Sequence, residues 1–113
     1  MNFGMFTDFH VRSGKSQAEA FDESFAQVVE AERLGFDTVW LAEHHFSPER
    51  AVLASPMVIA SAIAARTQRI RVGLAVQVLP LTNPLRVAEE AATVDHISKG
   101  RFDFGIGRSG LTR

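Results

Sequence analysis

The chain has 113 residues, of which 46% are hydrophobic and 22% are charged, and its formal net charge at pH 7 is −1. This composition is typical of a single globular unit with enough apolar residues to form a core, so residues 1–113 are treated as one domain. The near-neutral charge argues against nucleic-acid binding, and the absence of cysteine excludes disulfides, thiol catalysis and thiolate metal sites within these residues.

The first predicted strand covers residues 2–8, and a predicted helix follows it. Ser16 and Glu19 form a capping box, in which each side chain can accept a hydrogen bond from the other residue's backbone N–H group. Apolar residues then recur at helical spacing up to a glycine that can end the helix: Phe21, Phe25, Val28, Val29 and Gly35.

Two further helices are predicted after strands at residues 37–43 and 70–79. Each opens with a residue that can cap a helix, followed by a proline whose missing N–H group costs nothing at the first helical position: Ser55-Pro56 and Asn83-Pro84. The last of these helices is expected to end at Lys99-Gly100, before a fourth strand at residues 101–107.

Strands and helices therefore alternate, and the strands start roughly 30–35 residues apart, the length of a strand–helix–strand unit. This alternation predicts an α/β fold in which about four parallel strands are joined by three helices through right-handed crossovers. Either a doubly wound sheet or part of a (β/α)8 barrel would satisfy the pattern.

The last two strands each have one bulky and one small face. Residues 102, 104 and 106 are Phe, Phe and Ile, whereas residues 103, 105 and 107 are Asp, Gly and Gly. We expect the bulky faces to pack under helices. The small faces either leave room beside the sheet or mark close backbone packing, and the sequence leaves both possibilities open.

In both candidate folds, ligands bind at the carboxyl ends of the strands. Polar residues follow every predicted strand: Asp8, His10, Glu43, His44, His45, Thr82, Asn83, Arg108 and Ser109. His44 and His45 are neighbours in extended chain and point to opposite sides, which argues against a shared metal ion. The pattern favours one imidazole that faces a ligand and one that makes structural hydrogen bonds, although loops are generally polar without any function.

Residues 105–110 spell G-x-G-x-x-G, the pattern of a dinucleotide-binding loop. Such a loop must begin a helix and be followed by an acidic residue about 20 positions later, and only three residues come after Gly110. The dinucleotide interpretation is therefore poorly supported. Arg108 suits either a phosphate monoester or a surface salt bridge.

Three ordered blocks resemble the bacterial luciferase-like flavin monooxygenases. They are GFDTVWLAEHHF at 35–46, RVGLAVQVLPLTNPLRVAEE at 71–90 and DHISKGRFDFGIGRS at 95–109. The resemblance covers essentially the whole chain. It implies a (β/α)8 barrel that binds reduced FMN at the carboxyl ends of its strands, with residues 1–113 as its amino-terminal half.

The same resemblance implies roles for individual residues. His44 matches the catalytic histidine, which assists flavin–oxygen chemistry and proton transfer, and Glu43 lies beside the flavin cavity. Ala75 and Val76 match the position of a non-proline cis peptide bond under the flavin ring. Arg108 matches a ligand of the FMN phosphate. No metal ion is implied.

The implied reaction uses O2 and reduced FMN to form a C4a-peroxyflavin, which oxygenates an aldehyde or another small organic substrate. Luciferases carry a reactive cysteine where this chain has Gly107, which argues against luminescence. The resemblance also implies a separate flavin reductase and a dimeric full-length form. Because no secretion signal or membrane span is recognisable, we expect a cytoplasmic protein without membrane or nucleic-acid partners.

Two alternatives remain. One is a deazaflavin-dependent oxidoreductase of the same fold that transfers hydride, and the other is a non-catalytic half-barrel that assembles with another subunit. Since a complete (β/α)8 barrel has about 250 residues, we expect this chain alone to be inactive and to bind FMN weakly or not at all.

Overall fold

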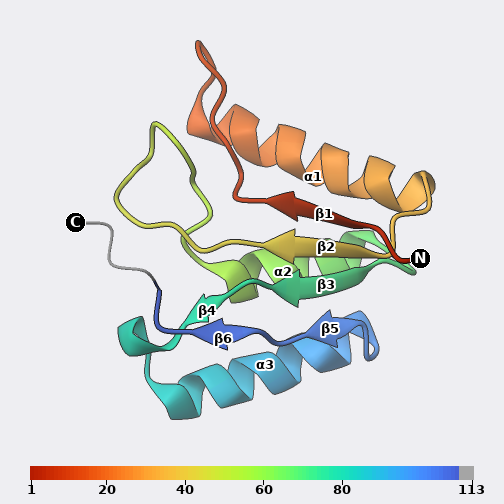
Figure 1. Cartoon of the computed structure of the whole chain (residues 1–113), viewed down its shortest axis with the longest axis vertical. Helices are drawn as coiled ribbons and strands as arrows, with labels where there is room; N and C mark the ends of the chain where they lie inside the picture. Colours follow the sequence, from red (N-terminus) through yellow and green to blue (C-terminus); the bar gives the residue numbers. More distant parts are fainter. Residues whose placement is uncertain (110–113) are drawn as a thin grey trace.

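The computed structural model describes residues 1–109, in which helices and strands alternate along the chain (Figure 1). In chain order the elements are β1 (Gly4–Thr7), α1 (Gln17–Arg33), β2 (Thr38–Leu41), α2 (Pro56–Arg66), β3 (Arg71–Leu74), β4 (Gln77–Val78), the 3-10 turn η1 (Leu79–Leu81), α3 (Pro84–Ser98), β5 (Phe102–Asp103) and β6 (Ile106–Gly107). The predicted α/β class with three helices is confirmed.

The strands form a parallel sheet in the order β1-β2-β3-β5, and β4 and β6 form a separate parallel pair. Each of the two long predicted strands, 70–79 and 101–107, is therefore divided in two. The two segments remain neighbours throughout, but their register shifts by one residue, since Val72 lies opposite Phe102 and Gln77 lies opposite Ile106. The contact with β2 ends at the same point: the backbone N–H of Ala75 still donates to Leu41 O of β2, whereas the N–H of Gln77 donates to Gly105 O between β5 and β6.

The helix boundaries follow the predicted capping chemistry with one exception. Ser16 and Glu19 form the capping box, and the side chain of Asn83 accepts a hydrogen bond from the Leu85 N–H at 2.9 Å. Ser55 is the N-cap residue of α2 as predicted, but its side chain makes no capping hydrogen bond. Its backbone carbonyl accepts a hydrogen bond from the Ile59 N–H at 3.1 Å, and Pro56 occupies the first helical position.

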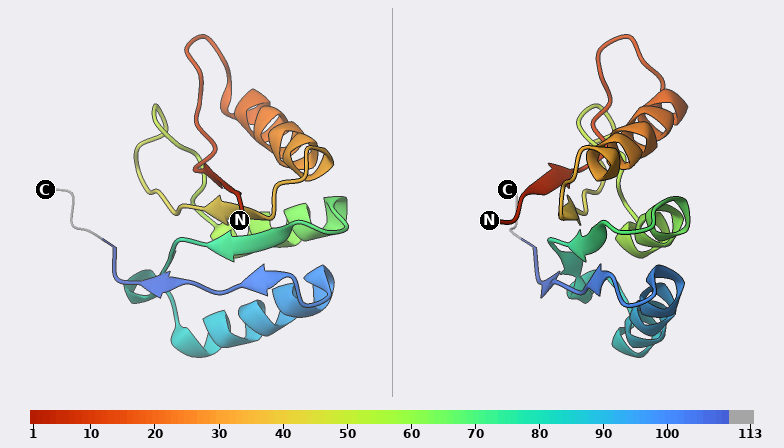
Figure 2. Two further views of the ribbon diagram at one scale, coloured as in Figure 1. Left: turned by 45° about the vertical axis from the view of Figure 1, so that its right-hand side comes forward. Right: turned by 90° about the vertical axis from the view of Figure 1, so that its right-hand side faces the viewer.

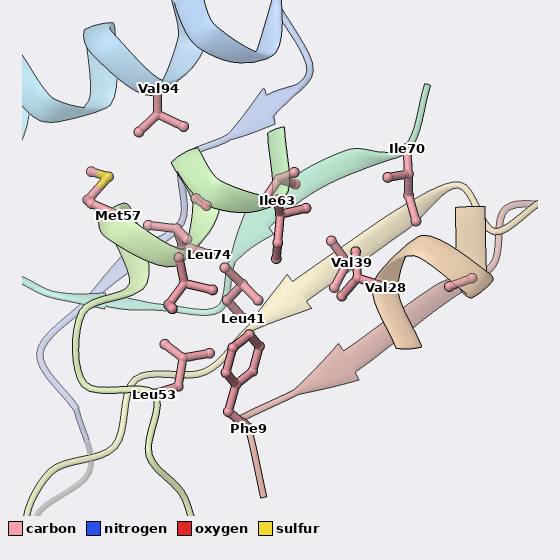
Figure 3. Close-up of a cluster of buried hydrophobic side chains, with 14 of the residues drawn as sticks. Phe9, Val28, Val39, Leu41, Leu53, Met57, Ile63, Ile70, Leu74 and Val94 are labelled. Atoms are coloured by element: carbon pink, nitrogen blue, oxygen red, sulfur yellow. The ribbon is translucent and has the colours of Figure 1, made fainter. Parts of the chain in front are cut away.

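The core lies between the sheet and the three helices, as the close-up in Figure 3 shows. Alternate strand residues face the helices: Val39, Leu41, Val72 and Leu74. Phe9 follows β1 and is completely buried, with its ring edge-on to Phe21 and Phe25 at centroid distances of 5.4 and 5.3 Å. The backbone of Phe9 has φ +57°, which is unusual for a bulky residue and is stabilised here by burial of the ring.

All three helices cover the same face of the sheet, and the opposite face is uncovered among the described residues (Figure 2). Trp40 of β2 lies across this uncovered face. A Cβ atom at Gly4 would come within 2.9 Å of its indole, and one at Gly73 within 2.3 Å. The two glycines therefore leave space for the indole on both neighbouring strands.

The small face of residues 101–107 serves close packing and does not leave open room. A Cβ atom at Gly105 would lie 2.0 Å from Leu74 O, and one at Gly107 would lie 2.8 Å from the Val76 side chain. On the bulky face only Phe102 packs against the core. The expectation that Phe104 and Ile106 also pack under helices is wrong, because the chain leaves the main sheet after Asp103 and these side chains are exposed.

The amino-terminal edge of the sheet is fixed by two charged side chains that bond to the backbone. The Arg101 guanidinium donates to the carbonyl oxygens of Ala64, Ile70 and Ser98 at 2.8–3.0 Å and so joins the ends of α2 and α3 to β5. The Glu32 carboxylate accepts from the backbone N–H groups of residues 68–70. If the sheet is part of the predicted (β/α)8 barrel, interactions at this edge serve stability.

We predict that Glu32→Gln destabilises the fold at neutral pH. Burial alone would raise the pKa of Glu32, but hydrogen bonds from the N–H groups of Ile70, Arg69 and Gln68 outweigh it, so the pKa is lowered. A lowered pKa means that Glu32 stabilises the fold above its unfolded pKa of about 4.3, and that this contribution is lost as pH falls through the folded value.

Urea unfolding followed by circular dichroism tests this prediction. At pH 7 the substitution should lower the free energy of unfolding by about 1–2 kcal/mol, and the deficit should shrink at acidic pH. Glu89→Gln, at an exposed position of α3, is the control and should change stability little. A deficit that is the same at both pH values would contradict the prediction.

Candidate functional site

The parallel register brings the carboxyl ends of the strands to one edge of the molecule. Thr7 lies opposite Leu41, and Leu41 lies opposite Leu74, so the segments that follow β1, β2 and β3 begin side by side. The extension of β3 into β4 and of β5 into β6 brings residues 77–81 and 108–109 to the same edge (Figure 1). The predicted gathering of polar strand ends is therefore present.

A hollow of about 700 Å³ lies at this edge, and we call it the carboxyl-edge hollow. Its polar wall consists of Glu43, His44, His45, Ser47, Arg50, Arg108 and Ser109, and its apolar wall of Val78, Pro80 and Leu81. Three of the predicted site residues thus line one cavity, in which Arg108 joins Glu43 and His44 although it is more than 60 positions away in the sequence.

Ala75 and Val76, the other two predicted site residues, are not among the residues that line this hollow. The peptide bond between them is cis, as the resemblance implies. It lies between β3 and β4, where the chain leaves β2 but stays paired with residues 101–107 in a register shifted by one residue.

The Glu43 carboxylate is nearly completely buried, with 3% of the side chain exposed. One oxygen lies 2.6 Å from His45 Nε2, and the other accepts a hydrogen bond from the Val78 backbone N–H at 2.9 Å. Both carboxylate oxygens are therefore engaged. Glu43 connects the segment after β2 to β4 and fixes the orientation of the His45 ring.

The His44 ring faces a different partner. Its Nε2 atom lies 3.4 Å from Asp8 Oδ2, in the segment that follows β1, and 28% of its side chain is exposed. The backbone N–H of His44 donates to Leu53 O at 2.9 Å, which fixes the main chain at this point. The two adjacent imidazoles thus have separate carboxylate partners, as the extended chain suggested.

Within residues 1–109, no group of three histidine or acidic side chains is arranged to hold a metal ion. Over the same residues, no helix has the length and hydropathy that crossing a membrane requires.

Arg108 follows β6 and lines two adjoining hollows. One is the carboxyl-edge hollow, and the other is an apolar hollow of about 510 Å³ that Leu79, Pro80, Pro84 and Ile106 also line. Arg108 has no ion pair with any other residue up to 109, so the structure gives no support to the surface salt bridge. Gly110, the last residue of the G-x-G-x-x-G string, lies outside the described residues.

Sequence reasoning missed three features of this edge. Asp8 was recognised as polar but not as the partner of His44. Arg50 enters the hollow from the loop after β2, where nothing in the local pattern distinguishes it from a solvated loop residue. Gln77 is 4% exposed, and within the described chain its Oε1 atom has no hydrogen-bond partner. A glutamine within an apolar strand was the available signal.

Comparisons with known proteins agree with these features. A family model described as luciferase-like monooxygenase matches residues 1–112. The alkanal monooxygenase alpha chain of Photorhabdus laumondii subsp. laumondii is 41% identical over 108 residues, which make up 96% of this chain and 30% of that protein. Limonene 1,2-monooxygenase of Rhodococcus erythropolis is 39% identical over 107 residues, 95% of this chain and 27% of that enzyme.

Among solved structures, the oxygenating constituent of 3,6-diketocamphane monooxygenase from Pseudomonas putida, in complex with FMN, has a TM-score of 0.89 at 26% identity. The match covers 98% of this chain and 30% of that one. The coenzyme F420 dependent tetrahydromethanopterin reductase of Methanopyrus kandleri has a TM-score of 0.70 at 24% identity. The match covers 96% of this chain and 27% of that one, and at this identity it is evidence for a shared fold only. The chain spans about 30% of the length of these relatives, so its fold is part of the predicted luciferase-like barrel.

We predict that Glu43→Leu loosens β4 locally. The substitution leaves the Val78 N–H without its acceptor, which costs about 1–3 kcal/mol for a buried donor. Hydrogen exchange measured by NMR should therefore show the Val78 amide exchanging at least about tenfold faster, since a factor of ten corresponds to about 1.4 kcal/mol. Glu49→Leu, at an exposed position in the same loop, is the matched control. Equal Val78 protection in both variants would contradict the prediction.

Proposed function

Because the chain belongs to the luciferase-like monooxygenase family, we propose that it contributes to a flavin-dependent monooxygenase that uses reduced FMN and O2 to oxygenate an aldehyde or another small organic substrate. The observation that carries this proposal is that His44 and Arg108 line the same hollow at the carboxyl edge of a parallel sheet. In this fold, that edge is where cofactors bind.

The residues of the carboxyl-edge hollow suit FMN chemically. Arg108 offers a guanidinium without an ion pair among residues 1–109, which matches the needs of a phosphate monoester. Val78, Pro80 and Leu81 supply an apolar wall for a flat ring system. The volume of about 700 Å³ lies within the range typical of small-molecule sites. When bound, reduced FMN supplies the electrons with which O2 is activated.

In the proposed mechanism, His44 moves the proton. Its imidazole is partly exposed to the hollow, and an imidazole can donate a proton to a developing oxyanion or accept one from the substrate. The apolar wall limits the access of water to the reacting atoms. His44 is therefore the residue to which we assign catalysis.

The remaining predicted residues bind or position the cofactor in this proposal. Arg108 holds the phosphate. Glu43 lies beside the cofactor and fixes β4, because both of its oxygens are bonded to the protein. The Ala75–Val76 peptide lies under the flavin ring, a placement that rests on the resemblance. A separate reductase supplies reduced FMN, and the full-length form is a dimer.

A deazaflavin is the second candidate cofactor, because one structural relative is named as F420-dependent. The FMN-bound relative has the higher TM-score, 0.89 against 0.70, which favours FMN. The absorption spectrum of the cofactor released on denaturation of the full-length protein would distinguish the two.

A third interpretation is a non-catalytic half-barrel that assembles with another subunit. The uncovered sheet face, which another subunit could cover, is compatible with it. The two interpretations differ in the activity of the assembled protein. A stable oligomer without flavin-dependent oxygenation would favour the assembly role.

We predict that His44→Ala lowers the yield of oxygenated product at least tenfold when the chain is part of a complete barrel. Loss of proton transfer of this size corresponds to about 1.4 kcal/mol of activation free energy. Product should be quantified with reduced FMN and O2 supplied at fixed concentrations. His96→Ala, at an exposed position of α3, should retain the yield. An unchanged yield in His44→Ala would remove this residue from the catalytic role.

We predict that Arg108→Ala weakens FMN binding at least tenfold, about 1.4 kcal/mol, because the phosphate loses its guanidinium partner. Titration of flavin fluorescence in the same complete-barrel context measures the affinity. Arg86→Ala removes a guanidinium that is 72% exposed on α3 and should leave the affinity as it is. Equal affinities in the two variants would show that Arg108 is an ordinary surface charge.

A further inference from the structure

We propose that Asp8 is a positioning residue that holds the His44 imidazole in one orientation and one tautomer. The catalytic meaning of this role rests on the proposed function, whereas the contact itself does not. Asp8 Oδ2 lies 3.4 Å from His44 Nε2, and both side chains are mostly buried, with 21% and 28% exposed respectively. No other carboxylate within residues 1–109 pairs with His44.

The backbone on either side of Asp8 is anchored to the segments that carry His44. Thr7 O accepts a hydrogen bond from the Ala42 N–H at 3.1 Å, directly after β2. Phe9 O accepts one from the Val52 N–H at 3.1 Å, in the loop after β2. Asp8 is therefore held between two hydrogen bonds to the same polypeptide segment that contains its imidazole partner.

The unusual backbone of Phe9 contributes to this placement. Its φ of +57° turns the chain sharply after Asp8, and its fully buried ring packs edge-on against Phe21 and Phe25. A bulky residue adopts this conformation only where the surrounding structure stabilises it. Core packing of Phe9 thus fixes the direction of the chain at Asp8, as Figure 3 illustrates for the position of Phe9 beside Leu41 and Leu53.

The other charged groups near Asp8 are engaged elsewhere. A small hollow of about 250 Å³ is lined by Asp8 together with His10, Arg12 and Glu23. The Arg12 guanidinium donates two hydrogen bonds to the Glu23 carboxylate. His10 Nδ1 lies 2.7 Å from Arg50 O. His44 is accordingly the ion partner that the structure gives to Asp8 among residues 1–109.

A carboxylate next to Nε2 determines which nitrogen of a neutral imidazole carries the proton. The negative Asp8 oxygen 3.4 Å from Nε2 attracts an N–H proton electrostatically, so the neutral His44 ring should carry its proton on Nε2. The lone pair then resides on Nδ1, which becomes the ring nitrogen that can accept a proton. Fixing a tautomer in this way is a known function of a carboxylate that bonds to a catalytic histidine.

The tautomer can be measured directly by NMR of the intact chain with ¹⁵N-labelled histidine. The chain has only four histidines, and His44→Gln assigns the resonances of residue 44. At a pH where the ring is neutral, we expect protonated Nε2 and unprotonated Nδ1 to predominate. Asp8→Leu removes the carboxylate beside Nε2 and should lower the ratio of the Nε2–H to the Nδ1–H tautomer at least threefold.

Asp22→Leu, at an exposed position of α1, is the matched control and should leave the ratio unchanged. A predominant Nδ1–H tautomer in the unsubstituted chain would overturn the proposal, and this outcome does not depend on the folding of any variant. An unchanged ratio in a folded Asp8→Leu variant would also overturn it.

A second measurement separates this proposal from the proposed function. In a complete barrel, Asp8→Leu should lower the turnover number at least threefold while the affinity for FMN stays the same. Absence of flavin-dependent oxygenation in the unsubstituted protein would contradict the proposed function and leave the tautomer result standing. An Nδ1–H tautomer in an active enzyme would contradict only the role of Asp8.

Discussion

The parallel register of the sheet is the constraint on which the site depends. Val39 and Leu41 of β2 face the helices, whereas Trp40 faces the opposite side, where glycines on β1 and β3 leave space for its indole. A slip of β2 by one residue would exchange these faces. Trp40 would then point into the packed core, and Val39 and Leu41 would be exposed to solvent. The same core contacts that prevent this slip fix how far β2 extends before Glu43 and His44. The position of the polar cluster is thus a consequence of core packing.

The two edges of the sheet differ in how their polar groups are used. At the amino-terminal edge, Arg101 and Glu32 bond to backbone groups of several elements, and their hydrogen-bonding capacity is directed into the fold. At the carboxyl edge, Arg108 lines a hollow without an ion pair in the described chain, and Gln77 keeps a buried oxygen without a partner there. Stability is concentrated at one edge, which allows the other to present groups that a ligand can engage.

The sequence was informative wherever a feature depended on local chemistry. The capping box at Ser16 and the cap at Asn83 are local hydrogen bonds, and the alternation of strands and helices reflects local periodicity. Features that depend on distant partners were not predictable. The division of residues 70–79 follows from a one-residue shift of register against residues 101–107, which only the paired strands reveal. The pairing of Asp8 with His44 depends on the left-handed turn at Phe9, which no local pattern indicates. The resemblance provided what local reasoning lacked at Ala75–Val76, where the cis bond is present.

The uncovered face of the sheet carries two large aromatic side chains, Trp40 and Phe6, and one ion pair. Phe6 is 63% exposed there, and Arg71 makes a bidentate pair with Asp103, which raises the pKa of the arginine. A charged pair whose members bond to each other can be covered without leaving an unpaired charge in an apolar environment. The Trp40 indole fills the space above Gly4 and Gly73. Any protein surface that packs on this face would therefore contact aromatic rings and an ion pair whose two charges compensate each other. The chain spans about 30% of its relatives' length; in a closed barrel, further strands would pair with the free sides of β1 and β5, and this face would line the interior. Closing the barrel would also wall the carboxyl-edge hollow on its open side, which links the completeness of the fold to the retention of a cofactor.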